Sequence, residues 1–470
     1  MFIEQIYTGC LAQGAYYIHS NGEAVIIDPL RETQPYIERA RRDGVKIKYI
    51  LETHFHADFV SGHLDLSKET GAKIVFGPNA APTYEHYSAN DGEELIVGEL
   101  TIRVLHTPGH TMESTCYLLL DKNFKEIAVF TGDTLFIGDV GRPDLAQKAA
   151  EMTQEELAGL LYESLRNKIM TLPDTVTVYP AHGAGSACGK NMSKETISTI
   201  GEQKLLNYAL RKDMTKEEFV KELTDGLLPP PSYFGMNVQM NKSGYDSIHE
   251  VMTRGVKPLS VEAFEMLANE AEALILDTRS ASDFAQRHIP NSIFIGLDGQ
   301  FAPWVGALIT DIKQKIILVT DIGREEETVK RLARVGYDYV LGYLEGGIKA
   351  WENSGKELAD VVRITAEELE NNTDYVKQPI IDVRKPGEYE AEHLELASSL
   401  PLDFINENFS SYPKSRAFVL HCAGGYRSMI AASILKSRGY HELVDVIGGY
   451  GALSKTSLSK TNFVCPTTKK

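Results

Sequence analysis

Apolar runs that end in polar, turn-forming residues recur along the first half of the chain. Residues 49–51 lead into the polar segment 53–58, 100–105 into 107–110, and 127–130 into 131–133, and segment 179–183 has the same form. A short apolar run bounded by turn signals is typical of a buried β-strand. The first half is therefore predicted to contain buried strands whose ends carry polar loops.

The second half of the chain repeats itself. Residues 273–279 (ALILDTR) return as 378–384 (QPIIDVR), and 297–298 return as 402–403 at the same offset of 105 residues. Each copy alternates apolar strands with helical patterns, which is typical of a parallel sheet flanked by helices. We therefore predict an α/β chain in four parts. They are an N-terminal domain over 1–245 with a proline-rich connection over 227–235, a first copy over 246–358, a second copy over 359–458, and a tail over 459–470.

Imidazole and carboxylate side chains occupy the polar ends of four predicted strands. They are His54, His56 and Asp58 after one strand, and His110, Asp133 and His182 after the other three. These are the side chains that bind zinc or iron at catalytic sites. A lone histidine is more often a surface or core residue, but four such strand ends in one chain favour a metal site.

Together, the HxHxD motif at 54–58, the distal histidine, the aspartate and the last histidine resemble the metallo-β-lactamase superfamily. The resemblance covers about the first half of the chain and implies an αββα sandwich with the metal at the strand ends. Dinuclear members read HxHxDH, whereas Phe59 follows Asp58 here and cannot coordinate a metal. The resemblance therefore implies a single metal held by His54, His110 and Asp133. Two imidazoles and a carboxylate match the facial triad of non-haem Fe(II) oxygenases, so one Fe(II) per chain is expected.

Two loops are similar to those of persulfide dioxygenases within that superfamily. Loop 138–145 contains Arg142, which would hold an anionic substrate group or, alternatively, form a loop-stabilising ion pair with Asp139 or Asp144. Loop 182–190 resembles the last-histidine loop of these enzymes. Its Cys188 would hold a persulfide at the substrate entrance or be a plain loop residue.

The same resemblance implies supporting roles around the metal. His56 and Asp58 would hydrogen-bond to ligands or bound water, and His182 would do the same or line the substrate pocket. In similar dioxygenases a proline-rich segment that ends in aromatic residues packs near the metal pocket. Tyr233 or Phe234 is therefore expected to line that pocket.

The second copy carries a thiol between a predicted strand and a helix. The loop consists of Cys422, Ala423, Gly424, Gly425, Tyr426, Arg427 and Ser428. Backbone N–H groups and a helix N-terminus at such a junction stabilise a thiolate. This CxxGxR loop resembles rhodanese, in which Cys422 would carry sulfur and Arg427 would add positive charge. The first copy has Asp321 at the cysteine position, so it looks like a catalytically dead rhodanese that serves as a spacer or dimerisation surface.

Composition limits the class of protein. The 470 residues suggest about three domains, and the net charge of −17 disfavours nucleic acid as a partner. No apolar run approaches the roughly 18 residues of a membrane span, and the first residues lack the basic region of a secretory signal. The five cysteines, which include Cys10 and the tail residue Cys465, are odd in number and scattered. They favour reduced thiols, and we expect a cytoplasmic protein without a membrane partner.

The resemblances together imply a persulfide dioxygenase–sulfurtransferase fusion in sulfide detoxification. It would oxidise a thiol persulfide with O2 to thiol and sulfite, and Cys422 would transfer sulfane sulfur to or from thiosulfate. A thioester hydrolase of glyoxalase II type, with a sulfurtransferase module, is the main alternative, and a sulfur sensor or scaffold is a second. The thiol carrier (glutathione, coenzyme A or bacillithiol) and the direction of transfer stay open. The resemblance suggests a homodimer or homotetramer.

Overall fold

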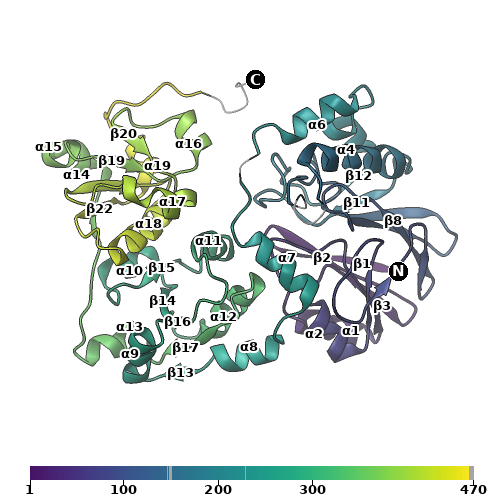
Figure 1. Cartoon of the computed structure of the whole chain (residues 1–470), viewed down its shortest axis with the longest axis horizontal. Coiled ribbons are helices and arrows are strands. Elements are labelled where there is room, and N and C mark those ends of the chain that lie inside the picture. The colour runs from purple at the N-terminus through teal and green to yellow at the C-terminus, as the bar shows by residue number, and fades with distance from the viewer. Residues whose placement is uncertain (146, 148–150, 228, 465–470) are drawn as a thin grey trace. The chain divides into compact units, whose positions relative to one another are not determined.

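The computed structural model describes residues 1–145, 147, 151–227 and 229–464 (Figure 1). Cys465, which we expected in the tail, lies outside the described residues. The chain divides into two compact units. One comprises Met1–Glu250 with Ala333–Gly336, and the other comprises Val251–Leu332 with Tyr337–Lys470.

The first unit contains two six-stranded sheets. The order of the first is β1-β2-β3-β4-β5-β6 and that of the second is β12-β11-β10-β9-β8-β7. The first sheet comprises β1 (Phe2–Thr8), β2 (Gln13–Ser20), β3 (Glu23–Ile27), β4 (Lys46–Leu51), β5 (Lys73–Phe76) and β6 (Tyr87–Ser88). The second comprises β7 (Glu94–Val97), β8 (Leu100–His106), β9 (Thr115–Leu120), β10 (Glu126–Gly132), β11 (Thr177–Pro180) and β12 (Ser198–Thr199).

Helices cover the outer faces of both sheets. Figure 1 shows α1 and α2 beside the first sheet and α4 and α6 beside the second. The helices are α1 (Gln34–Asp43), α2 (His63–Thr70), α4 (Gln154–Ser164), the π-helix η1 (Leu165–Ile169), α5 (Ile200–Leu206), the 3₁₀ helix η2 (Tyr208–Leu210), α6 (Lys216–Thr224) and α7 (Phe234–Ser243), and α8 (Ile248–Gly255) follows at the junction between the units.

Three apolar clusters account for this layering. The central cluster joins the facing sides of the two sheets and includes Tyr16, Val25, Tyr117 and Phe130. One outer cluster joins the first sheet to α1 and α2, and the other joins the second sheet to α4, α5 and α6. The central strands of each sheet are thus buried on both faces, which explains the apolar runs of strands such as β3 and β9. The predicted αββα sandwich is confirmed.

The second unit contains two five-stranded sheets with the same topology. Their orders are β13-β17-β16-β14-β15 and β18-β22-β21-β19-β20, and every strand pair in both is parallel. The first comprises β13 (Pro258–Leu259), β14 (Leu274–Asp277), β15 (Ile293–Phe294), β16 (Ile316–Val319) and β17 (Val340–Leu344). The second comprises β18 (Val362–Ile364), β19 (Ile380–Asp382), β20 (Ala397–Ser399), β21 (Phe418–His421) and β22 (Leu443–Val446). The internal repeat and its parallel sheets are confirmed.

Short helices connect these parallel strands. In the first copy they are α9 (Val261–Glu270), α10 (Ala281–Gln286), α11 (Phe301–Leu308), α12 (Glu325–Arg334) and α13 (Gly347–Asn353). In the second they are α14 (Ala366–Asn371), α15 (Thr373–Val376), α16 (Pro386–Ala391), η3 (Leu402–Phe404), α17 (Ile405–Asn408), η4 (Phe409–Ser411), α18 (Tyr426–Ser437) and α19 (Gly449–Leu453).

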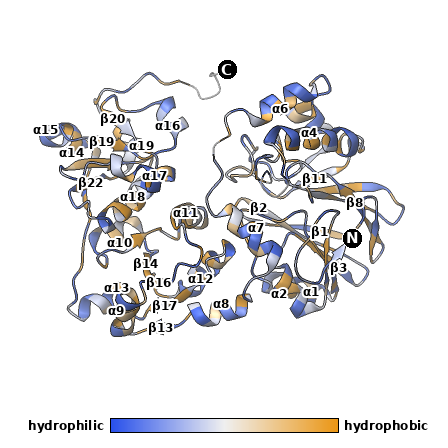
Figure 2. Ribbon diagram, viewed as in Figure 1, coloured by the Kyte–Doolittle hydropathy of each residue, from blue (hydrophilic) through white to orange (hydrophobic). Residues whose placement is uncertain are grey.

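Hydropathy follows the layers of this unit. Figure 2 shows orange along strands β14 and β16, whereas α12 carries both colours, as expected of a helix with one face on a sheet. Among the described residues, no helix has the length and apolar character needed to cross a membrane.

Candidate metal centre and thiol loop

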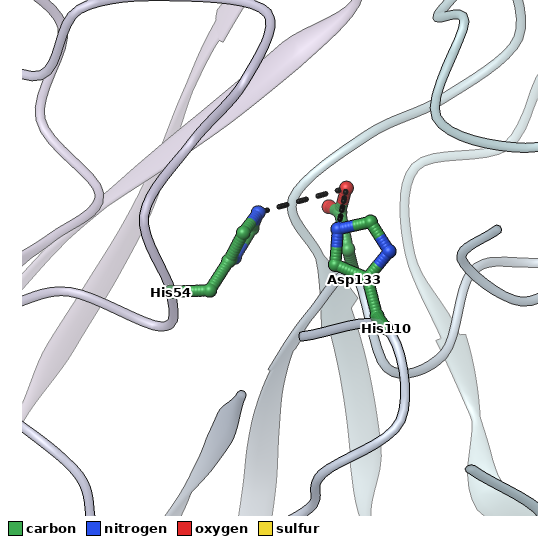
Figure 3. Close-up of side chains that lie close together, drawn as sticks. All are labelled: His54, His110 and Asp133. Carbon is green, nitrogen blue, oxygen red and sulfur yellow. Dashed lines mark ion pairs between the residues drawn. The ribbon is translucent and has the colours of Figure 1, made fainter. Parts of the chain in front are cut away.

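Three strand ends of the first unit bring His54, His110 and Asp133 together. His54 follows β4, His110 follows β8 and Asp133 follows β10, and all three side chains are buried. The Nε2 atoms of His54 and His110 lie 3.8 and 3.5 Å from Oδ2 of Asp133 (Figure 3). One ligand atom from each of the three lies within 4.8 Å of the others, a spacing that can hold a metal ion.

Hydrogen bonds fix both histidine rings with Nε2 facing the centre. Nδ1 of His110 donates to the carbonyl oxygen of Arg142 at 2.8 Å. The hydroxyl of Thr53 donates to Asp28 at 2.8 Å, so its oxygen accepts from Nδ1 of His54 at 2.9 Å. A neutral imidazole protonated at Nδ1 presents the Nε2 lone pair to a metal.

The electrostatics of the centre also suit a metal. Burial lowers the pKa of His54 well below its ordinary value, and the neighbouring histidines act in the same direction. Among the described residues, neither carboxylate oxygen of Asp133 has a hydrogen-bond partner. A buried carboxylate without a partner is costly, and a cation satisfies it. The residues present therefore fit a metal.

A second group lies on the other side of the Asp133 carboxylate. Nε2 of His182 is 3.5 Å from Oδ1 of Asp133 and 3.5 Å from Oδ2 of Asp58. His56, Asp58 and His182 also have the spacing of metal ligands. Phe59 is fully buried, and its ring centroid lies 4.3 Å from that of His56. At position 59, where the HxHxDH pattern has a histidine, this chain has an aromatic ring.

His56 contacts a buried acidic pair that sequence reasoning did not identify. Its Nε2 lies 3.1 Å from Oδ1 of Asp28 and 3.5 Å from Oε2 of Glu52. Burial alone would lower the pKa of His56, but the two carboxylates outweigh it and raise the pKa to about 9. Asp28 follows β3, a strand end without a recognisable motif, and only the fold brings it to His56. Glu52 follows β4, four residues before His56, but it lies outside the HxHxD pattern.

Arg142 and Cys188 both lie beside the centre. The guanidinium of Arg142 forms a bidentate ion pair with Asp144 at 2.7 Å, one of the two partners we considered from the sequence. Cys188 is 1% exposed, and its sulfur lies within ligand distance of Asp133 and His182. Burial and the carboxylates of Asp133 and Asp58 raise the pKa of this thiol well above its ordinary value. Cys188 is thus buried beside Asp133 and His182.

Helix α7 closes over the HxHxD loop. The side-chain amide of Asn241 donates to the carbonyl oxygens of His56 and Phe59 at 2.8 Å each and accepts from the N–H of Ser61 at 2.9 Å. Tyr233 lies at the start of this helix and is 4% exposed. The sequence signal for α7 was the aromatic end of the proline-rich connection, whereas Asn241 carried no signal of its own.

The thiol loop of the second copy lies between β21 and α18. Sγ of Cys422 accepts from the N–H of Gly425 at 3.1 Å and from the hydroxyl of Ser428 at 3.5 Å. Gly425 has φ +100°, a conformation that favours glycine and turns its N–H toward the sulfur. Ala423 and Gly424 form the exposed turn of the loop.

Arg427 does not face the sulfur as a free cation. Its guanidinium forms a bidentate ion pair with Glu388, with distances of 2.6 and 2.8 Å. Glu388 lies in α16, and nothing in the sequence indicated that it would bind this arginine. The positive charge predicted for the loop is therefore balanced by a carboxylate.

Comparison with known proteins fits both sites. The model of the metallo-beta-lactamase superfamily matches residues 8–182, and that of the rhodanese-like domain matches 260–354 and 365–456. The persulfide dioxygenase ETHE1 of Bos taurus, a mitochondrial protein, is 32% identical over 47% of this chain and 78% of its own length. The chain belongs to the metallo-beta-lactamase superfamily. It also carries two rhodanese-like domains, as the sequence resemblance implied.

Two further relatives place the chain within the metallo-beta-lactamase superfamily. A probable hydroxyacylglutathione hydrolase of Schizosaccharomyces pombe is 34% identical over 43% of this chain and 82% of its own length. A metallo-beta-lactamase structure from Staphylococcus aureus is 30% identical with a TM-score of 0.64, covering 73% of this chain and 98% of that one. That coverage extends beyond the metallo-beta-lactamase domain into the rhodanese-like region.

Proposed function

We propose that the chain is an Fe(II)-dependent persulfide dioxygenase fused to a rhodanese sulfurtransferase, acting in sulfide detoxification. The observation that carries the proposal is the buried centre of two imidazoles and one carboxylate, in a domain similar to persulfide dioxygenase ETHE1. The thiol loop of the second rhodanese-like domain adds a sulfur carrier to the same chain.

The side chains of this centre would hold the metal and leave room for reactants. His54, His110 and Asp133 would bind one Fe(II), which supplies open positions for O2 and a sulfur ligand when bound. The hydrogen bonds from Nδ1 of both histidines keep their rings from turning. Such fixed ligands contribute to catalysis by orientation.

The proposed substrate is a low-molecular-weight thiol persulfide. The overall reaction converts RSSH, O2 and water into RSH, sulfite and two protons. Arg142 would bind an anionic group of the substrate by exchanging it for Asp144. His56, Asp58 and His182 would hydrogen-bond to bound water or substrate, and Tyr233 would line the pocket.

The second site would connect this product to thiosulfate. The outer sulfur of a Cys422 persulfide transfers to sulfite, which breaks the S–S bond and releases thiosulfate and the Cys422 thiolate. The reverse reaction uses thiosulfate as donor. Gly425 and Ser428 would stabilise the thiolate through their hydrogen bonds to Sγ.

A thioester hydrolase of glyoxalase II type is the second candidate. It is favoured by the two-sided environment of Asp133, whose Oδ1 faces His182 while Oδ2 faces His54 and His110. Such an arrangement suits a carboxylate that bridges two metals. Phe59 opposes this reading because it removes one ligand of the second metal.

Metal content and oxygen uptake distinguish the two candidates. The protein is purified anaerobically and its metals are counted, and O2 uptake is then measured with the persulfides of glutathione, coenzyme A and bacillithiol. We expect about one iron per chain and uptake with at least one persulfide, both lost in His110→Ala. Two metals per chain with cleavage of an S-acylthiol, and no uptake, would establish the hydrolase instead.

A further inference from the structure

The side chain of Tyr426 leaves its own rhodanese copy and packs into the other copy. Its hydroxyl donates to the carbonyl oxygen of Gly296 at 2.7 Å, and its ring centroid lies 5.9 Å from that of Phe294. Gly296 and Phe294 belong to the copy without a cysteine, whereas Tyr426 is the first residue of α18 in the copy that carries Cys422. Both copies lie in one compact unit.

Two glycines of the first copy make room for this ring. A Cβ atom added at Gly299 would lie 2.4 Å from Cζ of Tyr426, and one added at Gly296 would lie 3.1 Å from its Cε2. Gly299 has no positive φ. Its backbone therefore tolerates other residues, and the three atoms nearest to an added Cβ all belong to Tyr426.

A second contact fixes α18 against the same segment. The N–H of Phe294 donates to Oγ of Ser433 at 2.9 Å, two turns further along α18. Phe294 lies in β15, an edge strand of the first sheet. An edge N–H needs a partner outside its sheet, and Ser433 provides one. Helix α18 is thus held by the first copy at two points.

Tyr426 directly follows Gly425, the residue whose N–H contacts the sulfur of Cys422. Gly425 donates its N–H to Sγ of Cys422 at 3.1 Å and joins Tyr426 through a peptide bond. Gly425 is also the N-cap of α18. Because glycine itself is flexible, the direction of its N–H depends on the groups that fix the chain on either side.

We infer that the rhodanese copy without a cysteine positions the thiol loop of its neighbour, by holding the Tyr426 ring between Gly296 and Gly299. Tyr426 acts through Gly425 and is a positioning residue. The inference rests on the proposed sulfurtransferase function of Cys422 and gives the first copy a role that needs no chemistry of its own.

The first copy is unsuited to sulfur transfer by itself. Asp321 stands at the cysteine position, and the first turn of α12 carries Glu325, Glu326 and Glu327. Carboxylates at a helix N-terminus occupy and neutralise the field that would attract an anionic substrate. Its contribution to transfer therefore comes through contact with α18.

The experiment uses the full chain with Gly299→Ala, which displaces the Tyr426 ring without replacing any residue of the thiol loop. Gln300→Ala, at the exposed next residue, is the matched control. Thiosulfate sulfurtransferase turnover, the pH profile of Cys422 alkylation by iodoacetamide, and O2 uptake are measured on each. We expect Gly299→Ala to lose at least about ten-fold in turnover, since small misplacements of reacting groups have large effects. Its alkylation midpoint should move to higher pH, with O2 uptake unchanged.

The double variant Gly299→Ala/Tyr426→Ala tests the mechanism. If the glycine acts through the ring, Gly299→Ala has no further effect in the Tyr426→Ala background. A folded Gly299→Ala protein with wild-type turnover and alkylation profile would overturn the inference, and so would equal losses in both backgrounds. The alkylation profile needs no sulfur substrate, so it tests the positioning even if the sulfurtransferase assignment fails.

Discussion

A single buried carboxylate, Asp28, organises the HxHxD loop. It accepts from the N–H and the hydroxyl of Thr53 at 2.8 Å each and faces Nε2 of His56 at 3.1 Å. Its own backbone has φ +49°, an unusual conformation for a residue other than glycine. Asp28 thus fixes His54 through Thr53 and holds His56 directly.

Replacing Asp28 by Asn should weaken metal binding. An amide cannot accept both bonds from Thr53, so the hydroxyl no longer orients His54. Loss of such a supporting partner typically costs 10–100-fold in metal affinity, and we expect that range for Fe(II) in competition with a chelating dye. Asp174→Asn is the control because Asp174 is an exposed partner of Lys204. Equal affinities in wild type and Asp28→Asn would contradict this role.

The candidate metal ligands could be found from sequence motifs, whereas the residues that hold those ligands in place could not. The resemblance to the metallo-β-lactamase superfamily implied His54, His110 and Asp133 as one ligand set, and the structure brings them within ligand distance. Their role as ligands stays a proposal. Asp28 lies far from the HxHxD motif in the sequence, and Asn241 lies inside helix α7. The partners of Asn241 are backbone groups, which leave no pattern in the sequence.

At the scale of elements, strand β22 carries a buried carboxylate beneath the thiol loop. Asp445 lies 3.0 Å from Nε of Arg363. Burial raises its pKa to about 6, against the opposing effects of Ser428 and Arg363. Between about pH 4 and pH 6, Asp445 is therefore protonated in the folded protein, whereas it is ionised in the unfolded chain.

This shift predicts a pH dependence of stability. With a folded pKa of about 6 and an ordinary value of 3.8, the contribution of Asp445 is most favourable below about pH 4. This contribution decreases by roughly 3 kcal/mol at most as the pH rises to about 6, and it is constant above that pH. Asp445→Asn should remove this slope, measured as the wild-type-minus-variant difference in the free energy of unfolding between pH 4 and 7. A difference that does not vary with pH would contradict it.

The internal repeat allowed the strands of the two rhodanese-like copies to be predicted from the sequence, but not the packing of the copies against each other. The two parallel sheets were predicted because apolar strands recur at a fixed offset, and both sheets are present. The packing of Tyr426 into the first copy was not predicted. It depends on the shape of segment 294–299, and the sequence pattern of the two copies does not specify how they meet.

At the scale of the whole molecule, the two proposed reactions use separate residues. The metal centre draws only on the first unit, and the thiol loop only on the second. Each of the two proposed activities should therefore be lost independently when its own site is removed.

Cys422→Ala should abolish thiosulfate sulfurtransferase activity and leave persulfide-dependent O2 uptake intact, so that sulfite accumulates. Removal of iron with a chelator should have the opposite effect, because Cys422 needs no metal. Both are measured with an oxygen electrode and by chromatography of sulfite and thiosulfate. Loss of both activities in either case would show that the sites depend on each other.

The space between Gly296 and Gly299 has a consequence for how this chain can change over generations. A duplicated module that has lost its nucleophile is usually free to drift. Here any larger side chain at position 299 would clash with the ring of Tyr426 in the copy that carries Cys422. Natural selection on sulfur transfer would then act on a domain that never touches sulfur.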